Sequence, residues 1–95
     1  MIAILATMRV LDGKGEAFEA VFNGLAAKVR ANEPGCLLYQ LTRSRKEPNT
    51  YKIMELYKDQ AALDQHAGSE YFKAGFPEMR ATLDGKADIE LLDAF

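Results

Sequence analysis

Residues 51–76 read YKIMELYKDQAALDQHAGSEYFKAGF and contain the clearest change from strand to helix periodicity in the chain. The first seven residues, Tyr51–Tyr57, alternate between two faces as a β-strand does. Asp59 is a good N-cap for a helix over Gln60–Ala67. The Gly68–Ser69 pair then breaks or bends this helix, and its serine can cap a second helical segment. The stretch therefore predicts a strand followed by two helical pieces.

The second helical piece continues beyond the quoted stretch. Its apolar residues, Phe72, Phe76, Met79 and Leu83, follow one another at steps of four, three and four. Pro77 lacks a backbone N–H, so we expect a kink or a fresh helix start near this residue. The final segment, Ala87–Phe95, alternates as a last strand.

The residues before the stretch add two more strands and a helix. Ile2–Leu11 predicts a first strand that is apolar on both faces, and Glu16–Asn32 carries an apolar stripe at helical spacing. Glu33–Gly35 ends that helix, and Cys36–Arg43 predicts the second strand. The polar loop 44–50 is short, which favours an antiparallel hairpin between the second and third strands.

The element order is β-α-β-β-α-β over a single domain of residues 1–95. Two βαβ halves with right-handed crossovers predict an α+β, ferredoxin-like fold with a four-stranded antiparallel sheet and helices on one face. A first strand that is apolar on both sides must be covered on both sides. We therefore expect a second copy of the chain against the open face, in a homodimer.

Composition narrows the classes of function. Charges of both signs are interspersed and sum to −2, and the only basic cluster, Arg43–Lys46, is short, so a nucleic-acid partner is disfavoured. No apolar run approaches the roughly 18 residues of a membrane span, and the N-terminus lacks the pattern of a signal peptide. The single cysteine, Cys36, excludes an internal disulfide and a cysteine-cluster metal site. These features predict a cytoplasmic protein.

Two titratable residues are candidates for chemistry. His66 is the only histidine, and it shares a helix side with Ala62 and Leu63, so it should point toward the sheet. A partly buried histidine held by one hydrogen bond is the alternative interpretation. Glu55 alternates with its strand neighbours and should also point inward, where it needs a partner such as an arginine or His66. A structural ion pair is as good an interpretation as a catalytic carboxylate.

Aromatic residues could line an apolar pocket for a small organic ligand. The residues concerned are Tyr39, Tyr51, Tyr57, Tyr71, Phe72 and Phe76. The alternative is that they are simply core. One histidine without clustered carboxylates predicts no metal site, and no glycine pattern of a phosphate-binding loop follows a strand.

Two segments carry a family resemblance. One is EPGCLLY at residues 33–39; the other runs from Tyr51 to Phe72 and contains the spaced residues E-x-Y, D-x-A-A-L-x-x-H and S-x-Y-F. Together they resemble the antibiotic biosynthesis monooxygenase (ABM) family. The resemblance implies a dimeric α+β barrel of two ferredoxin-like sheets, with a pocket between sheet and helices in each subunit. It also implies oxidation of an aromatic substrate, a small phenolic or quinol-like compound, by dioxygen without a cofactor.

The resemblance also suggests roles for individual residues. His66 would transfer a proton or anchor a phenol, and Glu55 would orient it. Tyr39, Tyr57 and Phe72 would line the pocket. Arg43 and Lys73 would be the basic groups available to a charged substrate.

The chain departs from some relatives and leaves other reactions open. Haem-degrading relatives use an asparagine on the first strand, a tryptophan where His66 stands and a histidine near Phe76. None of these is present, so haem degradation is disfavoured. An isomerase of a small carbonyl compound, similar to the relative that processes the phosphorylated autoinducer-2 signal, is one alternative. A non-catalytic dimeric ligand-binding module is another.

Overall fold

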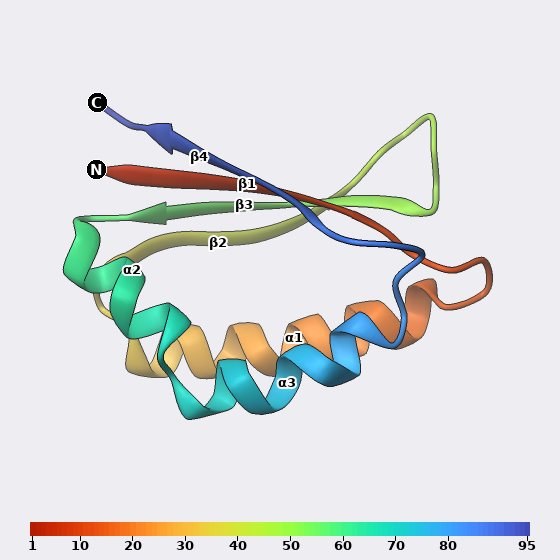
Figure 1. Ribbon diagram of the computed structural model, residues 1–95, viewed down its shortest axis with the longest axis horizontal. Coiled ribbons are helices and arrows are strands. Elements are labelled where there is room, and N and C mark those ends of the chain that lie inside the picture. The colour runs from red at the N-terminus through yellow and green to blue at the C-terminus, as the bar shows by residue number, and fades with distance from the viewer.

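The computed structural model describes residues 1–95 as one antiparallel sheet lying on a layer of helices (Figure 1). The four strands are β1 (Ile2–Arg9), β2 (Cys36–Arg43), β3 (Thr50–Tyr57) and β4 (Asp88–Asp93), in the order β2-β3-β1-β4. The helices are α1 (Gly15–Asn32), α2 (Gln60–Ala67) and α3 (Glu70–Arg80). This confirms the predicted ferredoxin-like fold, with the second crossover split into two helices.

The first and last strands are shorter than predicted. β1 ends at Arg9 rather than Leu11. Beyond it, Val10 donates its N–H to the Asn49 carbonyl at 2.7 Å, and Leu11 donates its N–H to the Thr82 carbonyl at 2.8 Å. β4 covers six residues of the predicted range Ala87–Phe95. Regular strand pairing therefore stops short of the predicted ends, although single backbone hydrogen bonds continue beyond it.

The two predicted caps of the second crossover are present. The Asp59 carboxylate accepts from the N–H of Ala62 at 2.9 Å, and the Ser69 hydroxyl accepts from the N–H of Phe72 at 3.3 Å. Each side chain satisfies one of the free N–H groups at a helix start. The cap at Ser69 is what begins α3 as a separate helix.

The predicted fresh start near Pro77 is wrong, because α3 runs through this residue to Arg80. A proline inside a helix leaves the carbonyl four residues earlier without its partner, here that of Lys73. Both residues are exposed, so water can satisfy that carbonyl. The proline is tolerated because it lies on the outer side of the helix.

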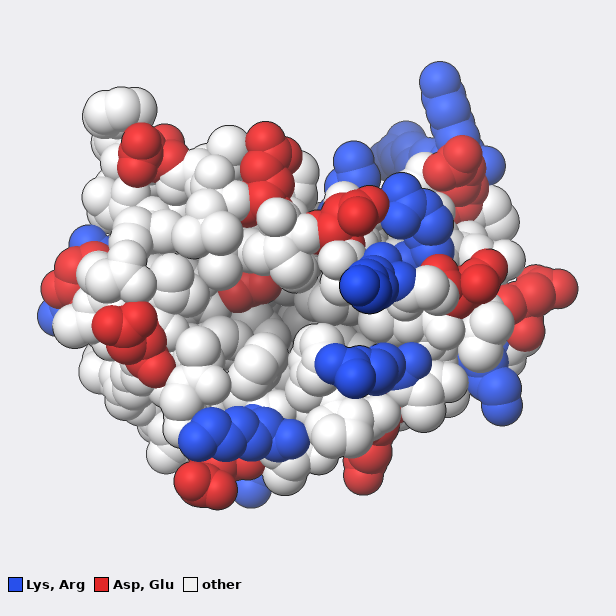
Figure 2. All heavy atoms as spheres, viewed as in Figure 1, with Lys and Arg blue, Asp and Glu red and all other residues white.

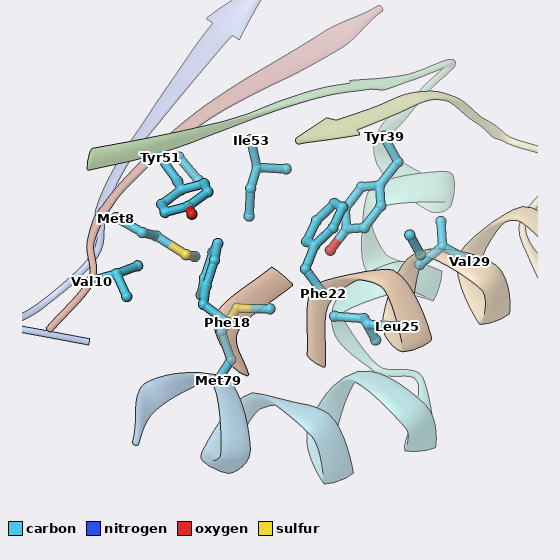
Figure 3. Close-up of a cluster of buried hydrophobic side chains, with 12 residues drawn as sticks. Met8, Val10, Phe18, Phe22, Leu25, Val29, Tyr39, Tyr51, Ile53 and Met79 are labelled. Atoms are coloured by element: carbon cyan, nitrogen blue, oxygen red, sulfur yellow. The ribbon is translucent and has the colours of Figure 1, made fainter. Parts of the chain in front are cut away.

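The core lies between the sheet and α1 (Figure 3). Phe22 stacks on Tyr39 with ring centroids 5.1 Å apart, and Phe18 tilts against Tyr51 at 4.8 Å. Burying side chains of this size contributes roughly 1.5–3 kcal/mol each.

No helix in the molecule is both long and apolar enough to cross a membrane.

The other face of the sheet is uncovered by helices. One row across it consists of Leu38, Leu56, Ala3 and Leu92, and the next consists of Gln40, Met54, Leu5 and Glu90. Three of the large apolar side chains in these rows are substantially exposed: Leu38 at 40%, Met54 at 45% and Leu92 at 42%. We call these two rows the open face. They place apolar side chains on the side of β1 that faces away from the helices, as the sequence predicted.

Candidate functional site

A cavity of about 720 Å³ lies between the sheet, α2, α3 and the segment that leads into β4. Thirteen of its 18 lining residues are hydrophobic. Its apolar wall includes Ile4, Ala6, Met8, Ile53, Leu63, Phe72, Phe76, Met79 and Ile89. Figure 2 shows the hollow that opens between the sheet and the helices. A largely apolar cavity of this size suits a small organic ligand.

Close packing of α2 on the start of β2 brings His66 to the cavity. A Cβ atom on Gly35 would lie 2.6 Å from the Cβ of Ala62, closer than real side chains approach. Only glycine at this position lets the first turns of α2 pack so tightly. His66 follows Ala62 by one helical turn, so it faces inward too and is only 4% exposed.

His66 is clamped from several sides. Its Nδ1 lies 3.1 Å from Oε1 and 3.2 Å from Oε2 of Glu33, whose side chain is almost fully buried. The hydroxyl of Tyr71 donates to the same carboxylate. Three aromatic rings pack around the imidazole: Tyr39 at 5.3 Å, Tyr57 at 5.5 Å and Phe72 at 4.8 Å between ring centroids. The imidazole is therefore fixed in position and orientation.

The free nitrogen of His66 faces the cavity. Nε2 makes no hydrogen bond within the chain. Every fully buried side-chain nitrogen or oxygen in the structure has a hydrogen-bond partner, so Nε2 is not fully buried and must reach open space. That space is the cavity, which His66 lines. The carboxylate of Glu33 favours the proton on Nδ1, which leaves a lone pair on Nε2.

Burial sets the charge of this histidine. It lowers the pKa of His66, and the attraction of Glu33 offsets this only in part. The imidazole is therefore neutral at neutral pH, and the contact with Glu33 is a hydrogen bond rather than a pair of full charges. A neutral imidazole with an open Nε2 can accept a proton.

A second polar group enters the cavity from the sheet. Glu55 on β3 accepts a hydrogen bond from the hydroxyl of Tyr57 at 2.5 Å through Oε1. Its Oε2 has no partner and, by the same reasoning as for His66, reaches the cavity. Burial raises the pKa of Glu55 to about 7, against the opposing effect of the Tyr57 hydrogen bond. Glu55 is therefore a second group that can exchange a proton near neutral pH.

Tyr39 supplies a hydrogen-bond donor. It lines the cavity, and its hydroxyl makes no hydrogen bond within the chain, so the hydroxyl also reaches the cavity. Figure 3 shows this side chain descending from β2 toward the helices. Burial raises the pKa of Tyr39, so the phenol keeps its proton.

The structure brings together four of the six predicted site residues. His66, Glu55, Tyr39 and Phe72 all line the cavity. Tyr57 does not line it, because this residue is fully buried behind the imidazole and holds Glu55 instead.

The geometry does not support three further predicted contacts. Arg43 is exposed near the other end of β2, about 13 Å along the strand from Tyr39, with its guanidinium 5.9 Å from the centre of the Tyr51 ring. Glu55 does not orient His66, because Glu33 occupies the Nδ1 side of the imidazole. Lys73 is exposed on α3 and does not line the cavity.

Glu33 is the site residue that the sequence prediction missed. In the sequence this residue ends the first helix and opens the segment EPGCLLY, and neither pattern assigns a role to its carboxylate. One signal was present: a carboxylate at a helix C-terminus opposes the helix dipole and gains nothing from that position. The residue instead turns its side chain inward toward His66, and its N–H bonds to the Val29 carbonyl at 2.9 Å.

The acidic groups near the cavity are spread out. Nowhere in the structure do three or more His, Cys, Asp or Glu side chains gather as the ligands of a metal ion would. Glu33 and Glu55 are instead each engaged by a tyrosine hydroxyl.

Comparison with known proteins places this architecture in a family. A model of the antibiotic biosynthesis monooxygenase family matches residues 1–78. The structure of a candidate antibiotic biosynthesis monooxygenase from Caulobacter crescentus CB15 is 52% identical, with a TM-score of 0.96 over 99% of this chain and 89% of that one. A conserved protein from Methanosarcina mazei Go1 is 28% identical, with a TM-score of 0.90 over 96% of this chain and 89% of that one.

A longer relative is found among curated proteins. An uncharacterised protein of Synechocystis sp. is 31% identical over 71 residues, or 75% of this chain, which spans 48% of that relative's length. The family match covers residues 33–39 and 51–72, which include Tyr39, Glu55, His66 and Phe72 of the cavity lining. This chain belongs to the antibiotic biosynthesis monooxygenase family.

Proposed function

We propose that this protein is a monooxygenase that needs no cofactor and oxidises a small phenolic or quinol-like compound with dioxygen. The observation that carries the proposal is the open Nε2 of His66 in an apolar cavity, with Nδ1 held by Glu33. Membership of the family supports the reaction class. The apolar wall suits a flat aromatic ring.

In the proposed reaction, His66 acts as a general base. Its Nε2 accepts the proton of a substrate hydroxyl, and Glu33 stabilises the imidazolium that forms. The substrate anion is electron-rich and reduces dioxygen, and an oxygen–carbon bond then forms on the ring. Overall the substrate loses two hydrogen atoms and gains one oxygen atom, while the second oxygen atom leaves as water.

Oxygen consumption with a panel of substituted hydroquinones tests this proposal. We expect His66→Ala to lower kcat by about 100-fold or more, because a positioned general base typically contributes at least this much. Gln65→Ala, at the exposed neighbouring position on α2, is the matched control and should keep its activity. Equal oxygen uptake by wild type and His66→Ala would remove the proposed role of His66.

An isomerase of a small carbonyl compound is the second candidate. Two titratable groups line the same cavity: the neutral imidazole of His66, whose pKa burial lowers, and Glu55, whose pKa burial raises to about 7. Such a pair could remove a proton from one carbon and return it to another. Turnover of a hydroxycarbonyl substrate under nitrogen, at the rate seen in air, would favour this reaction over oxygenation.

A non-catalytic ligand-binding module is the third candidate. It would be favoured if Tyr39, Tyr57 and Phe72 filled the space between sheet and helices. The cavity of about 720 Å³ leaves room for a ligand, so this observation does not favour it. Ligand binding without any turnover in either assay would be the result that supports it.

We also propose that two copies pack through the open face. The row of Leu38, Leu56, Ala3 and Leu92 would otherwise leave apolar side chains in water. Contiguous exposed apolar surface of this kind marks an interaction site. A second copy supplies the same rows about a twofold axis, which is the commonest symmetry of soluble assemblies.

A further inference from the structure

We propose that the ligand carries an anionic oxygen group, a carboxylate or a phosphate, which Arg80 and Lys86 bind at the rim of the cavity. The inference rests on the proposed function, since it assigns the end of the substrate away from the reacting hydroxyl. It concerns two residues that play no part in the proton transfer.

Both cations belong to the cavity that His66 lines. Arg80 is the last residue of α3, and Lys86 lies in the segment between α3 and β4. The guanidinium of Arg80 lies 5.1 Å from the centre of the Phe76 ring, which is part of the cavity wall. This contact holds the charge at the rim. In Figure 2, basic side chains border one side of the hollow.

Neither Arg80 nor Lys86 forms an ion pair within the chain. The ion pairs in the structure are Arg9 with Asp88 and His66 with Glu33. Asp88, close to Lys86 in sequence, is therefore already taken by Arg9 at 3.0 Å. Arg80 and Lys86 remain available to a ligand.

The charge of the cavity changes from rim to interior. The inner wall carries Glu55, and the carboxylate of Glu33 lies directly behind the imidazole. These acidic groups disfavour an anion deep in the cavity, whereas the two cations favour one at the mouth. The field therefore orients a ligand with its neutral hydroxyl inward, toward His66, and its anionic group outward.

Calorimetric titration with matched probes tests the inference. The first pair is para-coumarate and its methyl ester, which share a phenol and differ in the charge at the far end. Arg80 and Lys86 are exposed, so water screens the attraction between each cation and the anionic group of the ligand. We therefore expect the acid to bind only about tenfold more tightly than the ester at low salt. Para-hydroxycinnamyl phosphate is the third probe. Whichever of the carboxylate and the phosphate binds more tightly identifies the anionic group that the rim prefers.

The variants separate the rim from the rest of the pocket. In the double variant Arg80→Gln/Lys86→Gln, the acid should lose its tenfold advantage while the ester binds as in wild type. Lys46→Gln removes the same charge from an exposed position in the loop between β2 and β3, away from the cavity, and should leave both affinities unchanged. Added salt should weaken the acid and not the ester.

Other outcomes would overturn the inference. Equal affinity of acid and ester in wild type, or equal loss of both in the double variant, removes the anion site. If the ester still binds and hydroquinone oxidation still depends on His66, the proposed function survives that failure. If no probe binds and no hydroquinone is oxidised, the inference and the proposed function fail together.

Discussion

At the scale of single residues, Glu33 and His66 form the best-defined unit of the site. The carboxylate places both oxygens within 3.2 Å of Nδ1 and takes a further hydrogen bond from Tyr71. Such a carboxylate fixes the tautomer of the imidazole and stabilises its protonated form. Glu33 is therefore a positioning residue, which acts on the substrate only through His66.

The substitution Glu33→Gln tests this positioning role. A glutamine amide can donate to Nδ1, which moves the imidazole proton to Nε2 and removes the base. We expect kcat to fall about 100-fold or more with little change in KM, because the apolar wall is untouched. Steady-state oxygen uptake measures the rate, and nitrogen-detected NMR of the imidazole reports the tautomer.

Tyr71→Phe is the matched control for Glu33→Gln. It removes one donor to the carboxylate and leaves the carboxylate itself beside Nδ1. We expect this variant to keep the wild-type tautomer and to lose far less activity. A Glu33→Gln enzyme with wild-type kcat and an unchanged tautomer would show that Glu33 is merely structural.

Glu55 makes stability depend on pH in a direction opposite to that of most carboxylates. Its pKa rises from 4.5 to about 7 on folding, mainly through burial, so the folded state binds more protons between these values. The stabilising contribution of Glu55 is therefore present below pH 4.5 and lost as pH rises through 7. For His66 the pKa is lowered from 6.5, so its contribution is present above pH 6.5 and lost as pH falls.

The substitution Glu55→Gln isolates the first of these effects. Glutamine resembles the protonated acid at every pH, and His66 is present in both proteins. We expect the free energy of unfolding of the variant, relative to wild type, to increase by up to about 3 kcal/mol between pH 5 and pH 8. Urea denaturation at the two values measures it, and a constant difference would contradict the raised pKa.

At the scale of elements, the contact between Gly35 and α2 controls the position of the imidazole. Gly35 lies in the turn immediately before β2, and its carbonyl also accepts from the N–H of Lys58 at 2.9 Å. Because a Cβ atom on Gly35 would overlap the Cβ of Ala62, glycine at this position allows α2 to pack directly against the turn before β2. The distance from His66 to Glu33 depends on this approach.

Gly35→Ala should displace α2. The added Cβ would meet the Cβ of Ala62 at 2.6 Å, and relieving such an overlap costs about 1–3 kcal/mol of the free energy of unfolding. We expect activity to fall as well, since His66 moves with the helix. Urea denaturation and oxygen uptake measure the two effects.

A compensating variant gives this prediction its control. Ala62→Gly removes the other Cβ of the overlap, at a cost of about 1 kcal/mol for a glycine inside a helix. The double variant should then be more active than Gly35→Ala alone. If the two substitutions simply add in both stability and activity, the contact does not position α2.

At the scale of the whole molecule, the open face is the feature that a single chain leaves unexplained. Its apolar rows lie toward the end of the sheet where both termini emerge (Figure 1), while Thr42, Lys52, Thr7 and Asp88 form a polar row next to them. A face with this division can bury its apolar part against a copy and keep the polar part at the rim.

Light scattering at micromolar concentration checks the proposed dimer. We expect twice the mass of the chain for wild type and the monomer mass for Met54→Lys, because a lysine would be buried unpaired at the centre of the open face. Ala27→Lys adds the same charge on the exposed side of α1 and should remain a dimer. A monomeric wild type would exclude the proposed assembly.

Local spacing was sufficient to predict most of the elements and the faces of individual side chains. The alternation of Ile53, Glu55 and Tyr57 placed the carboxylate on the helix side of the sheet, where the structure has it. Asp59 and Ser69 marked the helix starts because a cap acts within three residues of itself. A fresh helix start near Pro77 was the part of the prediction that failed, because the exposed outer side of α3 tolerates a proline and the helix runs on to Arg80.

The sequence therefore determined the element order, the ferredoxin-like topology and the inward direction of His66 and Glu55. Periodicity acts over a few residues, and it carries this information without knowledge of the rest of the chain. Only the tertiary structure decided which groups meet. Glu33 reaches His66 across 33 residues of sequence, and Arg43 lies on the correct strand face but too far along it. Such pairings depend on how the crossovers pack on the sheet, and no local pattern records that.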